Sequence, residues 1–112
     1  MSVDALWTIE FETASRWTNG GVVVLQRDRL LGGDGAYYFI GTYRVTGDAL
    51  TADLHATHYH GQLISAYGDP ARELDVTIEA EVAKDAQTIS GQAMRSGYPA
   101  INLRMKRRAE IH

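Results

Sequence analysis

Apolar and polar residues alternate with a period of two along most of the chain, as they do in half-buried β-strands. The clearest example is the stretch Gly32–Tyr59, in which a glycine-rich turn and a turn at Thr46–Asp48 each precede an alternating run. One face of these two runs carries Tyr37, Phe39, Gly41, Tyr43 and Val45, then Leu50, Ala52, Leu54 and Ala56. Because Gly and Asp tolerate the positive φ of tight primed turns, the stretch predicts a β-hairpin with this face inward.

Five further runs predict strands. They are Leu6–Ala14, Gly21–Arg27, Glu73–Val82, Thr88–Arg95 and Ala100–Arg107. The Asn-Gly-Gly within Ser15–Gly21 predicts a turn, and Gln62–Tyr67 predicts one helical turn. The β-branched run Gly21–Arg27 is expected to be buried on much of both faces, and residues 28–31 to lead into the next turn. Gly91 is expected to mark a bulge or a close approach.

Seven or eight strands in hairpin order, with little helix, predict an all-β fold. A small antiparallel up-and-down β-barrel protects the edges of such a meander best, and an open sandwich is the alternative. We expect residues 1–112 to form a single domain, since a chain of this length buries roughly 65% of its unfolded surface.

Composition narrows the class of protein. The chain has no cysteine, which excludes thiol chemistry and fits a reducing compartment. Its net charge of −3, from 11 basic and 14 acidic residues, argues against nucleic-acid binding. We find no signal-peptide pattern and no apolar run that approaches a membrane span. A soluble cytoplasmic protein is expected.

The histidines of the segment His55–His60 are the main candidates for chemistry. On a regular strand His58 and His60 share a face while His55 points the other way, and two imidazoles need a third ligand to hold a metal. No Gly-x-Ser-x-Gly motif occurs, and the glycine-rich residues 32–35 precede a strand rather than the helix that binds phosphate. We therefore expect no catalytic residue, no metal and no cofactor, and predict that the protein is not an enzyme.

Two surface features suggest contacts. Tyr38 and Ile40, on the outer face of their strand, would form an exposed apolar patch of the kind that marks a partner surface. The basic cluster Arg104, Lys106, Arg107 and Arg108 is expected either to protect a strand edge or to face the acidic residues Asp75, Glu79 and Glu81.

Gly32, Gly33 and Asp34, then six intervening residues, Gly41 and an alternating hairpin, resemble the GrlR family. These small cytoplasmic proteins are named for a negative regulator of type III secretion genes, and the resemblance covers roughly the first 60 residues. It implies a lipocalin-like β-barrel that forms a homodimer and sequesters a transcriptional activator by direct contact. The family's namesake carries alternating acidic residues in the turn that here reads Thr46–Ala49, where Asp48 alone remains as a candidate partner contact.

Two functional hypotheses follow. The first is a non-enzymatic regulator that acts through protein contacts, with Tyr38, Ile40 and Asp48 as partner-binding residues. The second is a barrel that binds a small apolar ligand; its lining candidates are Trp7, Phe39, Tyr43 and Leu54. The volume of the interior separates them, because a lumen well under ~300 Å³ leaves no room for a typical ligand.

Overall fold

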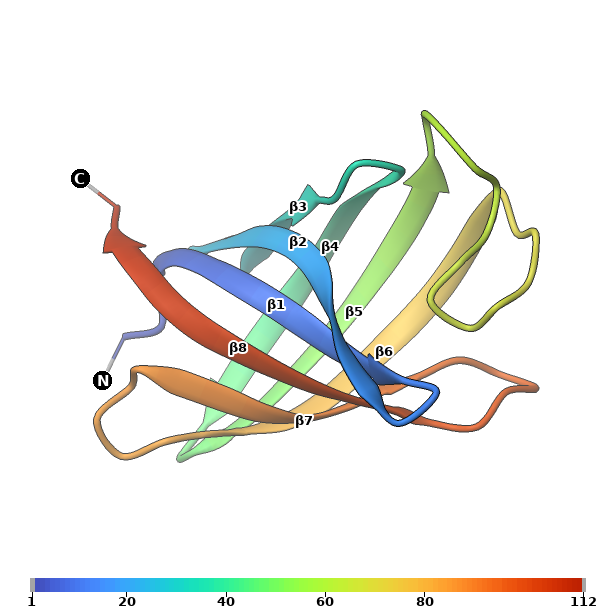
Figure 1. Cartoon of the computed structure of the whole chain (residues 1–112). Coiled ribbons are helices and arrows are strands. Elements are labelled where there is room, and N and C mark those ends of the chain that lie inside the picture. The colour runs from blue at the N-terminus through green and yellow to red at the C-terminus, as the bar shows by residue number, and fades with distance from the viewer. Residues whose placement is uncertain (1, 112) are drawn as a thin grey trace.

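Eight antiparallel strands follow one another around a closed barrel in the order of the sequence (Figure 1). The computed structural model describes residues 2–111. The strands are β1 (Ala5–Thr13), β2 (Arg16–Gln26), β3 (Arg29–Gly33), β4 (Tyr37–Thr46), β5 (Ala49–His58), β6 (Glu73–Val82), β7 (Thr88–Met94) and β8 (Ile101–Glu110). Pairing of β8 with β1 closes the barrel, so that every strand pairs with two neighbours. The predicted all-β up-and-down barrel is confirmed.

Residues 2–111 form no helix that is long and apolar enough to cross a membrane.

The turn between β1 and β2 differs from the prediction. It is formed by Ala14 and Ser15, which both have positive φ (50° and 63°), as a two-residue primed turn requires. The Asn-Gly-Gly lies inside β2, where Gly21 has φ 96° and Asn19 Oδ1 accepts a hydrogen bond from its backbone N–H. Asn-Gly-Gly therefore makes an irregularity within the strand, and the register with β1 shifts at this level.

The sequence pattern predicts that residues 28–31 lead into a turn and form no strand, and this prediction is wrong. Arg27 and Asp28 form a second two-residue turn with positive φ, and residues 29–33 then pair with both β2 and β4.

The predicted burial of much of both faces of β2 is also wrong. Val22 is 45% exposed because it points away from the barrel, and Val23 is buried because it points into it.

The inward faces predicted for β4, β5, β6 and β8 are confirmed. Tyr37, Phe39, Leu50, Ala52, Ala56, Leu74, Val76, Ile78, Val82, Leu103 and Met105 are buried. Gly41 and Gly91 sit where strands approach closely: a Cβ on Gly41 would lie 2.0 Å from the Asp53 carbonyl oxygen, and one on Gly91 2.1 Å from that of Glu79. The prediction of a close approach at Gly91 is confirmed.

The two ends of the barrel are built differently (Figure 1). Both termini and the short β2–β3, β4–β5 and β6–β7 turns meet at one end, here called the closed end. The other end carries the β1–β2, β3–β4 and β7–β8 turns and the long irregular connection of residues 59–72, here called the cap loop. The helical turn predicted within it at Gln62–Tyr67 is wrong, since the segment contains only turns and irregular backbone.

Candidate functional site

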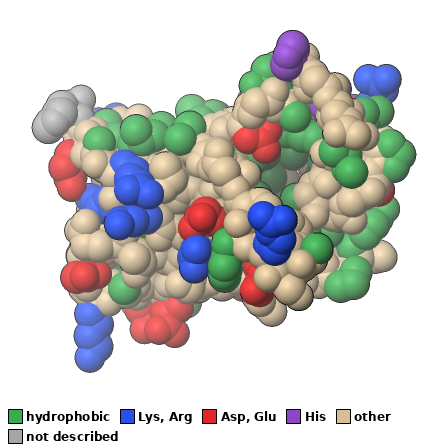
Figure 2. Space-filling model, viewed as in Figure 1, with side chains coloured by type: hydrophobic (Ala, Val, Ile, Leu, Met, Phe, Trp, Pro, Cys, Tyr) green, Lys and Arg blue, Asp and Glu red, His purple; other side chains and the backbone are tan. Residues whose placement is uncertain are grey.

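A cavity of 410 Å³ occupies the barrel interior next to the cap loop. Apolar side chains from the strands form most of its wall, and residues 64–68 of the cap loop complete it. The strand residues that line it include Ile9, Phe11, Val23, Leu30, Tyr37, Phe39, Leu54, Ala56, Leu74, Val76, Ile78, Ala93, Ile101 and Met105. The surface is hollowed between the cap loop and the barrel wall in Figure 2.

Strand β2 extends past β3 at this end of the barrel. Residues 16–19 of β2 pair with β1 but lie beyond the reach of the shorter β3, which pairs from Val22 onward. At Gly20 the absence of a side chain makes room for the ring of Phe11, which a Cβ would approach to 2.5 Å. Phe11 and Gly20 both line the cavity, so this glycine shapes the wall directly.

Side chains fill the closed end, in contrast. Trp7 is fully buried there, and its Nε1 donates a hydrogen bond to the Val3 carbonyl at 2.9 Å. The Arg107 guanidinium lies 5.7 Å from the centre of the indole ring and donates to the carbonyls of Ser2, Asp4 and Ala86. The N-terminal segment, the β6–β7 turn and β8 are thus joined around one tryptophan.

One ion pair holds the cap loop against the β7–β8 turn. Arg95 binds Asp69 with two parallel hydrogen bonds of 2.6 and 3.0 Å, and the hydroxyls of Ser65 and Tyr98 donate to the same carboxylate. Hydrogen bonds from Arg95 and Ser65 hold the pKa of Asp69 well below its usual range. The Arg95 guanidinium also lies 4.1 Å from the ring centre of Tyr98 and 5.5 Å from that of Tyr67. A bidentate pair between aromatic rings fixes the loop's orientation.

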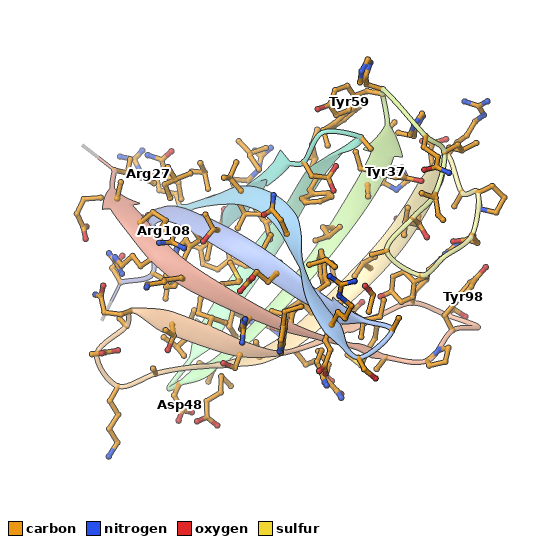
Figure 3. The ribbon with its side chains drawn as sticks, viewed as in Figure 1. Arg27, Tyr37, Asp48, Tyr59, Tyr98 and Arg108 are labelled. Carbon is orange, nitrogen blue, oxygen red and sulfur yellow. The ribbon has the colours of Figure 1, made fainter. Side chains whose placement is uncertain are left out.

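The opposite side of the cap loop is attached to the β3–β4 turn. Asp34 holds that turn, because its Oδ1 accepts hydrogen bonds from the N–H groups of Ala36 and Tyr37, each at 2.8 Å. The hydroxyl of Tyr37 then donates to the Ala71 carbonyl, and that of Tyr59 to the Asp34 carbonyl. Figure 3 shows Tyr37, Tyr59 and Tyr98 together at this end of the molecule. The loop is therefore secured on both sides of the cavity.

The four lining candidates from the sequence divide between the two ends. Phe39 and Leu54 line the cavity. Trp7 and Tyr43 lie outside its lining, because the closed end packs around them. The Tyr43 hydroxyl donates to Asp4 at 2.6 Å, and burial together with this hydrogen bond raises the pKa of Tyr43 to about 12.

The cavity residues that sequence reasoning missed include those of the cap loop, among them Ser65 and Tyr67. An irregular segment has no period that would distinguish inward from outward positions. The cap loop is 14 residues long, whereas the other strands are joined by short turns, and a long loop in a compact domain is often functional. This length is the signal from which its role at the cavity could have been predicted.

The predicted contact residues lie at different places. Tyr38 and Ile40 are on the outer face of β4, 43% and 48% exposed. Leu31 of β3 pairs with Ile40, and Val22 of β2 lies one strand further on. These four residues and Tyr59, whose ring centre is 6.2 Å from that of Tyr38, form the outer patch. Asp48 is separate from it, at the closed end (Figure 3).

The histidines have separate environments. His55 is on the outer face of β5, where its Nδ1 lies 2.8 Å from Asp75 and its Nε2 3.0 Å from Glu73. These carboxylates raise the pKa of His55 above its ordinary value. His58 packs edge-on against Tyr37 and reaches the Gly61 carbonyl. Among residues 2–111 no group of three His, Cys, Asp or Glu side chains could hold a metal ion.

Neither alternative for the basic cluster of β8 is found. Strand β8 is not an edge strand, since it pairs with both β7 and β1, and Arg104 and Arg108 contact β1 rather than the acidic residues of β6. Arg104 forms an ion pair with Glu10 at 2.7 Å and stacks over Trp17 at 4.1 Å, and Arg108 donates to Thr8. The closure of the barrel is the reason, because it makes β1 a direct neighbour of β8. Strand β6, which carries the acidic face, is separated from β8 by β7.

These features define a class: a closed eight-stranded antiparallel β-barrel, filled at one end and hollow beneath a secured loop at the other. No protein-family model matches the chain, and no curated protein matches it. The resemblance to the GrlR family stays a prediction.

Proposed function

We propose that the protein is a small-molecule-binding barrel that holds an apolar ligand in the cavity beneath the cap loop. The single observation that carries this proposal is the cavity itself. Its 410 Å³ lies above the ~300 Å³ below which a typical ligand has no room, and its wall is mainly apolar. A well-packed interior has few voids larger than a water molecule, so a hollow of this size favours an occupant.

The proposal is tested by measuring whether an apolar dye binds in the cavity and whether a larger side chain there weakens the binding. N-phenyl-1-naphthylamine, a neutral apolar dye whose fluorescence rises out of water, is titrated into the protein. We expect saturable binding that Leu54→Trp weakens by at least about tenfold, because the larger side chain takes up ligand space. Thr51→Trp is the matched control, since Thr51 is on the same strand but exposed on the outer face.

Circular dichroism must show that both variants retain the barrel. Absence of saturable binding to the unmodified protein, or equal binding by the two tryptophan variants, would contradict the proposal.

A second function, regulation through protein contacts as a homodimer, is favoured by the outer patch. Its residues Val22, Leu31, Tyr38, Ile40 and Tyr59 are 43–55% exposed and lie on neighbouring strands and the adjoining loop. Contiguous apolar surface of this kind marks interaction sites. The occupant we propose is a second copy of the chain, with an activator protein bound by the resulting dimer.

Sedimentation velocity at micromolar concentration tests the dimer. We expect a dimer for the unmodified protein and a monomer for the double variant Tyr38→Ser with Ile40→Ser, which removes the centre of the patch. The double variant Thr42→Ser with Arg44→Ser changes the same outer face further along β4 and should remain dimeric. A strictly monomeric unmodified protein would rule this function out, as would an unaltered dimer in the patch variant.

A further inference from the structure

Tyr67 of the cap loop carries an unusual polar atom. Its Oη is buried and has no hydrogen-bond partner, and within residues 2–111 it is the one buried side-chain nitrogen or oxygen in this state. Leaving such a group unpaired costs about 1–3 kcal/mol, so buried hydroxyls nearly always have partners. Tyr67 also lines the cavity. A molecule that reached Oη from the cavity would supply the missing partner.

The other polar side chains of the described cavity wall each have at least one hydrogen-bond partner in the protein. Thr18 donates to the Phe11 carbonyl, Asn19 Oδ1 accepts from Gly21, and Ser65 bonds to Asp69. Asp34, the one acidic residue of the lining, accepts two backbone hydrogen bonds. Among the described residues of the wall, Tyr67 is thus the one whose polar side-chain atom is buried without a partner.

The charges around the cavity restrict the ligand further. No lysine or arginine is among the described residues that line it, and the Arg95 guanidinium, 5.5 Å from the ring centre of Tyr67, is bound in bidentate fashion by Asp69. A buried anion without a counter-charge is costly, which disfavours a carboxylate or phosphate. Burial raises the pKa of Tyr67, which keeps its hydroxyl protonated and able to donate.

We infer that the cavity binds a neutral, mainly apolar molecule with one hydrogen-bond acceptor, such as a ketone or ester, to which Tyr67 Oη donates. This inference rests on the proposed ligand-binding function and adds the chemical class of the ligand. The aromatic ring of Tyr67 has a separate role, because it packs beside Arg95 and Tyr98 in the cap-loop anchor.

Three probes of nearly the same shape represent a neutral ligand with an acceptor, a pure hydrocarbon and an anion. They are 2-acetylnaphthalene, 2-ethylnaphthalene and 2-naphthoate. Each is measured by displacement of N-phenyl-1-naphthylamine from the unmodified protein and from Tyr67→Phe, which keeps the ring and removes the hydroxyl. We expect the ratio of ketone affinity to hydrocarbon affinity to be about 2- to 12-fold higher in the unmodified protein than in Tyr67→Phe, the worth of one hydrogen bond, and 2-naphthoate to bind most weakly. The hydrocarbon should bind the two proteins equally well, because it makes no hydrogen bond.

The outcomes distinguish this inference from the proposed function. The same ratio of ketone affinity to hydrocarbon affinity in the unmodified protein and in Tyr67→Phe would mean that the Tyr67 hydroxyl does not bind the ketone, and would overturn the inference alone. Tightest binding of 2-naphthoate would overturn it as well. Failure of all three probes would overturn the proposed function together with it.

Discussion

Replacing Gly41 with alanine is expected to destabilise the barrel by about 3 kcal/mol or more, the upper range for forcing atoms into a packed interior. The new Cβ would lie 2.0 Å from the Asp53 carbonyl oxygen and 2.7 Å from the Leu54 Cα. Both obstacles are backbone atoms of β5, so no side-chain rotation relieves the contact. Strands β4 and β5 would have to separate where Gly41 pairs with Leu54. Urea unfolding followed by far-ultraviolet circular dichroism measures the loss.

Gly35→Ala is the matched control for this experiment. Gly35 is in the β3–β4 turn, where an added Cβ meets no atom within 4 Å and φ does not lie in the positive range. We expect an effect within about 0.5 kcal/mol, as for most surface substitutions. If Gly41→Ala unfolds at the same urea concentration as Gly35→Ala, the close approach of β4 and β5 does not require glycine.

Trp7→Ala is expected to lower the free energy of unfolding by about 3–5 kcal/mol, the usual cost of truncating a buried aromatic side chain. Trp7 is fully buried at the closed end, and the substitution removes both its packing and its hydrogen bond to the Val3 carbonyl. Domains of this size have about 5–15 kcal/mol of stability, so the loss is a large fraction of the whole. The same denaturation experiment measures it.

Trp7→Phe provides the comparison, since it keeps an aromatic ring beside Arg107 and should cost clearly less. Because Trp7 lies outside the cavity lining, folded Trp7→Phe should still bind N-phenyl-1-naphthylamine with unchanged affinity. An unchanged midpoint for Trp7→Ala would show that this tryptophan does not hold the closed end together. Lost dye binding by folded Trp7→Phe would show that the two ends are not independent.

The strands and their inward faces followed from the sequence because period-two alternation is a local property. The pattern of β4 and β5, from Tyr37 to Ala56, correctly separated interior from exterior, and the run Glu73–Val82 is β6 to the residue. Errors occurred where the local signal was short or ambiguous. Strand β3 has five residues, too few to show a period, and Asn-Gly-Gly is as compatible with a distortion inside a strand as with a turn.

The site was only half predictable. Phe39 and Leu54 were found because they alternate on strands, but alternation places Trp7 and Tyr43 inward as well and does not say at which end the barrel is hollow. That distinction depends on what reaches each end: the N-terminal segment and Arg107 at one, the cap loop at the other.

The sequence by itself determined the class of fold, since strand periodicity and turn-forming residues leave few arrangements for a chain of this length. The tertiary structure decided where the cavity lies, that Asp69 and Arg95 hold its cap, and that Tyr67, a residue of its wall, has a buried hydroxyl without a partner. The physical reason is distance along the chain. Asp69 and Arg95 are 26 residues apart, and their contact exists only because the barrel brings the cap loop beside the β7–β8 turn.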